Sequence, residues 1–317
     1  MSGLATAPSA ASGRAAARLR PATSPSPWGH VARAVAGQVA RVVYLVIVSA
    51  FLVAPIVVVL AASLTSRAFL TFPPHGLSLK WYSSAFAQGG YVSALVFSLW
   101  TAALVACLSA LLGYLLALSL GSISTVWTPG ARPTRLARAA SWLRVGSASA
   151  RTVRLLALVP VMLPLIVVAV ALLQFFSSIG LIYSPLSIVF GQLVMCLPFG
   201  VMMTELGMAR VDSSACLAAE SLGASRFRVL RTVVLPASSS GIAGAWAFSF
   251  VIAFGDSTIA LLLQSPGQIT APVDIFNVLY FNPFAPTVAA MAGLLAVITF
   301  VCLAIGVAFF ERSGGDK

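Results

Sequence analysis

The chain has 317 residues, of which 60% are hydrophobic and only 8% are charged. A soluble domain carries about a quarter charged residues, so this composition excludes a soluble protein and predicts an integral membrane protein. The net charge of +12 would favour nucleic acid as the partner of a soluble protein, but the positions of the charges favour another explanation.

The first segment, residues 1–40, is rich in Ala, Ser, Pro and Arg and contains no acidic residue. Targeting peptides share this composition. The apolar run that follows is too long for the apolar region of a signal peptide, and no clear cleavage site precedes it. We therefore predict a disordered basic cytoplasmic tail over 1–40 and a first transmembrane helix over 41–64.

Six apolar stretches are long enough to cross a membrane, because a hydrocarbon core of about 30 Å requires roughly 20 helical residues. Each stretch must be helical, since lipid offers no partner to unpaired backbone groups. The stretches are 42–64, 93–120, 155–178, 183–204, 237–263 and 286–310. The predicted fold is an all-α polytopic membrane protein with six transmembrane helices. Its remaining parts are a periplasmic segment over 65–92, a transmembrane domain over 93–310 and a tail over 311–317.

The basic residues predict the orientation of the chain. All Lys and Arg residues except Arg67 and Lys80 lie in the N-terminal tail, in loops 121–154 and 206–236, or at the C-terminus. Because basic residues are retained on the cytoplasmic side, we expect both termini and both loops to be cytoplasmic. This distribution also explains the net charge, so we expect no nucleic-acid partner.

Proline residues interrupt two of the predicted spans. Pro160 and Pro164 lie in the third span and Pro198 lies in the fourth. Proline removes a helical hydrogen bond and bends the helix. Two interpretations are open: a broken helix that lines a transport pathway, or a kink tolerated in a packed bundle.

The insert 121–154 is basic and contains Trp127 and Trp142. It is either an interfacial helix on the anionic lipid of the inner leaflet or a solvated loop.

Loop 206–236 contains capping residues and apolar spacing that predict two short helices. Asp212 is placed to cap the first helix, and Gly223 is a natural stop because glycine accepts the left-handed conformation. Ser225 is placed to cap the second helix, and Pro236 to open the fifth span. Apolar residues at helical spacing in the first helix are Ala215, Ala218, Ala219 and Leu222. The three arginines of the second helix are Arg226, Arg228 and Arg231. Exposed apolar surface on such a knob predicts a protein partner.

The sequence from Leu217 to Ala224, followed by Leu235-Pro236, resembles the EAA loop of binding-protein-dependent ABC importer permeases. The resemblance covers about 75–310, because the segment Leu79–Tyr82 and the opening of the last span, Pro286–Ala290, also resemble this family. The segment Pro286–Ala290 is similar to the polyamine-type branch of this family. Two segments of the fifth span, Ser249-Phe250 and Phe254-Gly255-Asp256, are also similar to that branch. One residue departs from the family pattern: Leu217 stands where the family has Glu, and Glu220 lies three residues later.

The resemblance implies a type I ABC importer permease fold in a bacterial inner membrane. It implies that loop 206–236 inserts into an ATPase subunit. The coupling residues that it implies are Ala218, Ala219, Glu220, Leu222, Gly223, Ala224, Arg226, Arg228, Leu235 and Pro236. The implied partners are an ABC ATPase dimer, a second permease subunit in a heterodimer, and a periplasmic substrate-binding protein.

The chain itself is not expected to be an enzyme or to bind a cofactor or metal. The phosphate-binding motif GxxxxGK[ST] is absent from the sequence, so ATP and Mg²⁺ are expected on the partner ATPase. The four cysteines are widely spaced, and no Cys/His cluster predicts a metal site.

Asp256 is the one acidic residue well inside a predicted span, and an intramembrane acid indicates a functional site. It suits a polyamine-like cation, although the branch also contains permeases for phosphonate, ferric iron and thiamine. The alternatives for Asp256 are a hydrogen bond to Ser257 or Thr258, or a cap at a break beside Gly255. Gln192 is deep enough to line the same pathway or to make an interhelical hydrogen bond.

A secondary transporter or channel without an ATPase is the competing function, and a non-transporting scaffold is a third. A secondary transporter would need intramembrane charge pairs or proton-relay carboxylates, and the spans offer only Asp256. Asp274 and Asn277 in the predicted outer loop 264–285 either contact a docking protein or belong to a solvated loop.

Overall fold

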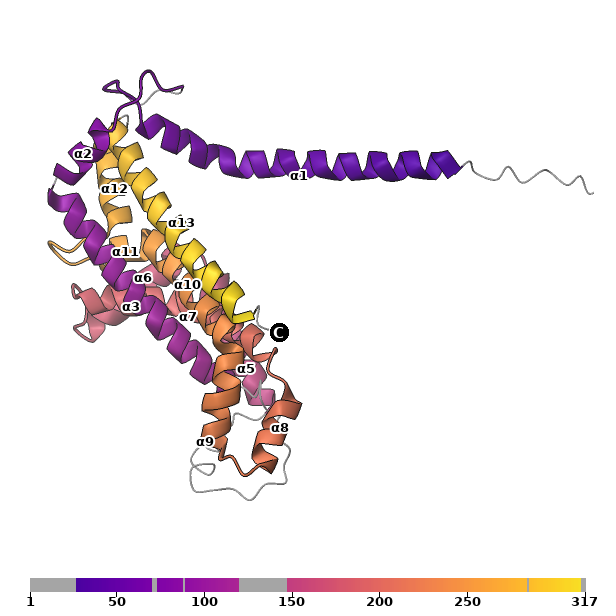
Figure 1. Cartoon of the computed structure of the whole chain (residues 1–317). Coiled ribbons are helices and arrows are strands. Elements are labelled where there is room, and N and C mark those ends of the chain that lie inside the picture. The colour runs from indigo at the N-terminus through magenta and orange to yellow at the C-terminus, as the bar shows by residue number, and fades with distance from the viewer. Residues whose placement is uncertain (1–26, 70–72, 88, 120–146, 284, 315–317) are drawn as a thin grey trace, which may run out of the picture. The chain divides into compact units, whose positions relative to one another are not determined.

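The computed structural model describes residues 27–69, 73–87, 89–119, 147–283 and 285–314. Within these ranges the chain is helical, with two isolated β-bridges and no strand (Figure 1). The helices are α1 (Pro27–Ser63), α2 (Lys80–Ala87), α3 (Gly89–Ser119), α5 (Ser147–Met162), α6 (Leu165–Ser178), α7 (Pro185–Met208), α8 (Ser213–Ser221), α9 (Arg226–Val229), α10 (Leu235–Gly255), α11 (Thr258–Leu263), α12 (Ala271–Phe281) and α13 (Pro286–Gly314). A π-helical turn, Leu230–Val234, joins α9 to α10. The all-α prediction is confirmed.

Five helical stretches in the described part of the chain are long and apolar enough to cross a membrane. They are Ala36–Ser63, Gly90–Ser119, Pro185–Met208, Arg226–Gly255 and Pro286–Gly306. The sixth span is a bent pair in which Leu155–Met162 and Leu165–Ser178 meet at 108°. Six spans are therefore present when this pair is counted as one.

The prolines act differently in the two spans that contain them. Pro164 stands at the N-cap of α6, where the third span breaks. The residue before a proline avoids the α conformation, which explains why α5 ends at Met162. Pro198 lies inside α7, which continues through it. The sequence predicts a bend at both places, and the large break occurs only in the third span.

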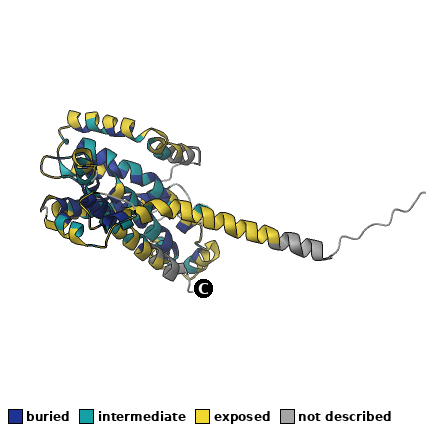
Figure 2. Cartoon of the chain, turned by 90° about the horizontal axis from the view of Figure 1, so that it is seen from above, coloured by how far each residue is buried: buried dark blue, intermediate teal, exposed yellow. Residues whose placement is uncertain are grey.

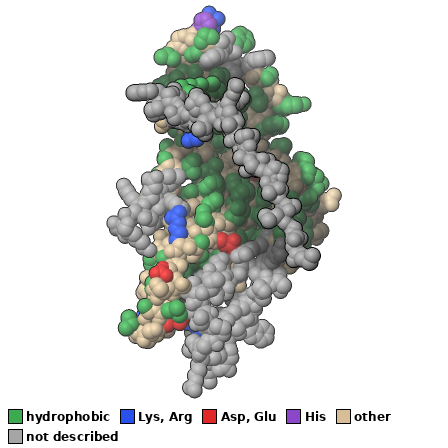
Figure 3. Space-filling model, turned by 90° about the vertical axis from the view of Figure 1, so that its right-hand side faces the viewer, with side chains coloured by type: hydrophobic (Ala, Val, Ile, Leu, Met, Phe, Trp, Pro, Cys, Tyr) green, Lys and Arg blue, Asp and Glu red, His purple; other side chains and the backbone are tan. Residues whose placement is uncertain are grey.

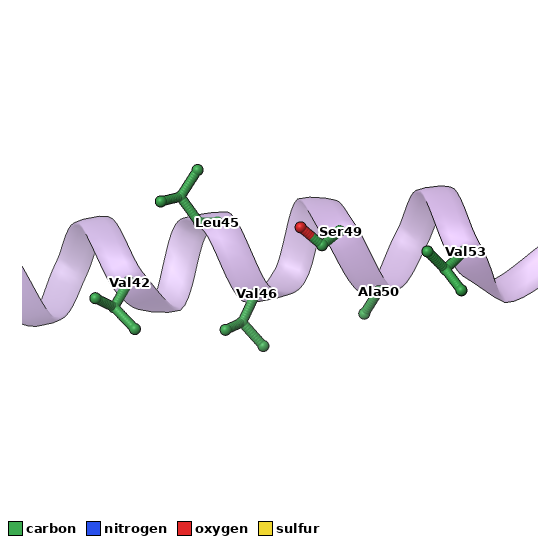
Figure 4. Close-up of a pocket in the computed structure, with 6 residues that line it drawn as sticks. All are labelled: Val42, Leu45, Val46, Ser49, Ala50 and Val53. Carbon is green, nitrogen blue, oxygen red and sulfur yellow. The ribbon is translucent and has the colours of Figure 1, made fainter. Parts of the chain in front are cut away.

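The first of two compact units, residues 1–55, contains most of α1. Its helix begins at Pro27, so the prediction of disorder over 1–40 is wrong for residues 27–40. Proline suits a first helical position because its missing N–H would have no helical partner there. Nearly all of residues 36–55 are exposed (Figure 2), and one side of the helix forms a shallow apolar groove (Figure 4). The groove is lined by Val42, Leu45, Val46, Ser49, Ala50 and Val53.

The second unit, residues 56–317, is built around α3, α7 and α10. Glycines allow these helices to approach closely: a Cβ on Gly207 of α7 would lie 2.6 Å from the Cα of Gly241 on α10. The hydroxyl groups of Ser109 and Ser249, which are 2.8 Å apart, join α3 to α10. Small residues and buried hydroxyl pairs of this kind are typical of helix packing in membranes.

The fifth span differs from its predicted bounds of 237–263. Pro236 is at the start of α10, as predicted, but the continuous helical stretch that contains the span begins earlier, at Arg226. The span also ends at Gly255, and α11 follows after a break at Asp256-Ser257. The helix passes through Pro236 because the preceding turn is π-helical, a wider turn than an α-helical one.

The segments at the other end of the second unit contain more helix than the predicted loops. In the predicted periplasmic segment, α2 is held by the Trp81 indole, which donates to the carbonyl of Thr65 at 2.8 Å. The predicted outer loop 264–285 contains the apolar helix α12, in which Asp274 and Asn277 are half-buried. A fully solvated loop is therefore the wrong interpretation of 264–285. In the insert 121–154, residues 147–154 are helical, and the remainder lies outside the described residues.

Candidate functional site

The first helix of loop 206–236 begins where its capping residue predicts. The Asp212 carboxylate accepts from the backbone N–H of Ser214 at 2.8 Å and from the Ser214 hydroxyl at 2.6 Å. These bonds satisfy a helical N–H that would otherwise have no partner. The predicted cap of α8 is thus confirmed.

The turn after α8 depends on glycine. Gly223 has a φ of +83°, and its N–H donates to the carbonyl of Glu220 at 2.9 Å. The N–H of Ala224 donates to the carbonyl of Ala219 at 3.0 Å. This pair of bonds is the Schellman arrangement, which satisfies the last carbonyls of a helix. The predicted helix stop at Gly223 is confirmed.

The second helix begins at its predicted cap but has no separate end. The Ser225 hydroxyl accepts from the N–H of Arg228 at 3.4 Å and caps α9. From Arg226 the helix continues through the π-helical turn into α10, with no boundary at Leu235-Pro236. Leu235 and Pro236 are exposed on this continuous helix. Loop 206–236 therefore consists of one short helix, α8, followed by a turn and the N-terminal extension of the fifth span.

An apolar cluster packs the loop against the ends of α3 and α7. Its buried residues are Tyr114, Ala117, Met208, Cys216, Val229 and Val234. Ala219 and Ala224 pack at its edge. Burial raises the pKa of the Cys216 thiol, and the carboxylates of Glu220 and Asp212 raise it further. Cys216 is thus an inert packing residue in this position.

The outer side of the loop exposes large apolar side chains. Leu222 is 89% exposed and Phe227 is 69% exposed, and Ala218 is also exposed. Figure 1 places α8 and α9 at the end of the second unit opposite α2 and α12. The prediction did not include Phe227, although it is the one aromatic residue of loop 206–236 and lies opposite the buried Val229.

The charged residues of the loop include an ion pair that spans the Gly223 turn. The Arg226 Nε lies 3.9 Å from the Glu220 Oε1, and both side chains are largely buried. Arg228 and Arg231 are exposed. In Figure 3 the visible acidic side chains lie in the lower half of the molecule, toward α8 and α9, and the surface above them is largely hydrophobic. The pair braces the bend between α8 and α9.

The second group of candidate residues lies at the break in the fifth span. Gln192 on α7 is 1% exposed, and its Nε2 donates to the carbonyl of Ala253 at 3.1 Å and to Asp256 Oδ2 at 3.3 Å. The Asp256 carboxylate also accepts from the N–H groups of Ile259 at 3.2 Å and Ala260 at 3.1 Å. Asp256 therefore caps α11, and Gln192 ties this cap to α7.

The buried Gln192 Oε1 has no hydrogen-bond partner within the described structure. Among the described residues, the donors to the Asp256 carboxylate are uncharged. At the end of the fifth span, the Asp256 carboxylate thus lies beside the side-chain amide of Gln192, whose oxygen has no hydrogen-bond partner among the described residues. Both are acceptors, which suits a cationic ligand more than an anionic one.

Comparison with known proteins identifies the family. Residues 136–313 match the family model described as the inner membrane component of binding-protein-dependent transport systems. The chain belongs to this family. Over 265 residues it is 26% identical to the spermidine/putrescine transport system permease protein PotC of Escherichia coli (strain K12), covering 84% of this chain and 91% of PotC. It is 24% identical over 270 residues to the putrescine permease PotI of the same strain, covering 82% and 88%.

Solved structures of ABC transporters share the fold. The chain resembles a bacterial ABC transporter involved in the import of the polysaccharide alginate, with a TM-score of 0.56 at 14% identity, covering 86% of this chain and 94% of that one. An inward-facing structure of the MetNI methionine ABC transporter gives a TM-score of 0.50 at 19% identity, covering 69% and 96%. The chain is therefore a multi-pass inner-membrane permease of the ABC importer family. Members of this family are not enzymes, and membership implies an ATPase and a substrate-binding protein as partners.

Proposed function

We propose that the chain is the transmembrane subunit of an ATP-driven importer for a small, polyamine-like cation. A periplasmic binding protein delivers the cation, and an ABC ATPase dimer, which holds ATP and Mg²⁺, drives the transport. The names of the relatives PotC and PotI support a polyamine as substrate. A second permease subunit completes the pathway as a heterodimer, and both termini of this chain lie in the cytoplasm.

The main support for an ATPase partner is the exposed apolar surface on loop 206–236, the proposed coupling loop. Leu222 and Phe227 project from a short loop braced by two caps, a Schellman turn and an ion pair. A hydrophobic side chain that is held rigid and exposed outside the membrane indicates a protein interface. Docking through these residues is apolar, so it needs no glutamate at position 217. Glu220, the nearby acid, forms an ion pair with Arg226 within the loop.

The pathway for the cation passes the break at Asp256 in our proposal. Support comes from the carboxylate, whose donors in the structure are uncharged, and from the free Gln192 Oε1 beside it. An ammonium group passing this point would find two acceptors that its own N–H groups can satisfy.

The docking proposal is tested by capturing partners of the tagged full-length chain from native membranes. Leu222→Asp combined with Phe227→Asp should abolish capture of the ATPase, because each introduces an unpaired charge into an apolar interface. Leu77→Asp is the matched control, since Leu77 is 80% exposed in the predicted periplasmic segment. Equal capture of the ATPase by the wild-type chain, the double variant and Leu77→Asp would refute docking through this surface.

A further inference from the structure

The helix that leaves the coupling loop is locally weakened at the π-helical turn. At this turn the N–H of Leu235 donates to the carbonyl of Leu230, five residues earlier. Pro236 follows directly and has no N–H to offer to the carbonyl of Thr232. Two hydroxyl groups bond carbonyls that flank the turn: Thr232 donates to Arg228 at 2.8 Å, and Ser238 donates to Val234 at 2.7 Å. This stretch therefore has fewer backbone bonds along its axis than a regular helix.

The segments on both sides of this stretch are firmly held. On the loop side, two backbone bonds at Gly223 and the Glu220–Arg226 pair tie α8 to α9. On the membrane side, Gly241 lies against Gly207, so that a Cβ on Gly241 would be 2.6 Å from the Gly207 Cα. Between these two rigid segments, the π-helical turn and Pro236 are the part that can bend most easily.

A buried polar group, the Tyr114 hydroxyl on α3, lies beside the turn. It is within reach of the Ser238 side chain but makes no hydrogen bond of normal geometry within the described residues, and Tyr114 is 8% exposed. Buried hydroxyl groups are nearly always paired, because an unpaired one loses its hydration without compensation. A bend of the helix at this turn would change the surroundings of the Tyr114 hydroxyl.

We propose that residues 230–236 form the joint at which the coupling loop pivots against α10 during transport. The loop then moves as one rigid body that includes α8, the Gly223 turn and α9. Gly223 sets the shape of this body and is not its hinge. This inference rests on the proposed function, because the movement is the one that the partner ATPase would impose. It adds a second arrangement of the loop, which alternating access requires.

Distances between spin labels in the complete transporter test the joint directly. In a chain without its native cysteines, the pair Ser221→Cys and Ser239→Cys spans residues 230–236. The pair Ser213→Cys and Arg228→Cys spans only the Gly223 turn. Between the nucleotide-free and the vanadate-trapped complex, the first distance should change and the second should stay constant. The joint is refuted if the first distance stays constant, or if the second distance changes as much as the first.

A deletion tests whether the wide turn is needed. Removing Thr232 together with Pro236→Ala takes out the extra residue and the proline, so the helix becomes regular. This variant should still capture and retain the ATPase, while uptake per ATP hydrolysed falls at least about 5-fold, the lower end of ordinary coupling between sites. Leu77→Ala, which lies outside the loop and keeps the chain length, should remain close to wild type.

Normal uptake per ATP in the deletion variant would overturn the joint. Failure of the wild-type chain to capture any ATPase would instead overturn the proposed function, so the two failures are distinguishable. If the deletion variant alone loses the ATPase, the turn shapes the docking surface and the pivot is refuted.

Discussion

Replacement of Gly223 by valine should uncouple ATP hydrolysis from transport. Gly223 has a φ of +83°, and a Cβ added there would meet no atom within 4 Å, so the effect is conformational and not steric. The left-handed conformation costs an L-residue roughly 1–2 kcal/mol, with a β-branched residue at the upper end. Replacing glycine also lowers the conformational entropy of the unfolded chain, which offsets about 0.4–1 kcal/mol of that cost.

The net loss is therefore about 1 kcal/mol, which lowers the equilibrium constant between the correctly bent loop and other conformations roughly fivefold. The variant should reach the membrane in normal amounts, because the change lies outside the spans. Uptake and ATP hydrolysis measured together in proteoliposomes should show a several-fold fall in substrate transported per ATP.

Two control variants separate this effect from general destabilisation. Gly223→Asn should retain most coupling, because asparagine tolerates the left-handed conformation. Gly180→Val introduces the same backbone strain in the turn between α6 and α7, since Gly180 has a φ of +71° and equally open surroundings. Gly180→Val should leave coupling unchanged. Normal coupled transport in Gly223→Val, or an equal loss in Gly180→Val, would refute the reasoning.

Three further predictions address other parts of the chain. At the break after the fifth span, Asp256→Asn keeps a capping side chain and removes the charge. Uptake should therefore weaken as strongly as in Asp256→Ala. If only the alanine variant is impaired, Asp256 is a cap and does not contact the cation. Maleimide labelling can be compared between a chain whose only cysteine is Cys216 and one whose only cysteine is the exposed Ser221→Cys on the same helix. Labelling of Cys216 should become fast only at a higher pH, because burial raises the pKa of its thiol and the thiolate is the reactive form. Equal pH profiles would show that Cys216 is accessible. Gly207→Ala should lower thermal stability by about 1–3 kcal/mol, since the added Cβ meets backbone atoms of Gly241 and Ser238, and an unchanged melting temperature would contradict the close crossing.

Local features of loop 206–236 could be predicted from the sequence because each depends on a few adjacent residues. Asp212 and Ser225 act as caps through N–H groups two or three residues away, and Gly223 acts through its own φ. The spans could be predicted for a similar reason, since length and hydropathy alone decide whether a helix can cross lipid.

Features that depend on distant residues could not be predicted. Pro236 is typical of a helix start, and only the π-helical turn before it lets the helix continue. Gln192 and Asp256 are 64 residues apart in sequence, and their hydrogen bond follows from the packing of α7 on α10. The exposure of Phe227 likewise depends on which side of α9 faces the cluster around Tyr114, and this is set by tertiary packing.

Uptake into proteoliposomes tests the central claim most directly. The chain is reconstituted with its second permease, its ATPase and its binding protein, and radiolabelled putrescine or spermidine is supplied with the binding protein. The account predicts uptake only when the ATPase is present with hydrolysable ATP. Uptake driven by an ion gradient, or uptake that persists without the ATPase, would contradict it and identify a secondary transporter.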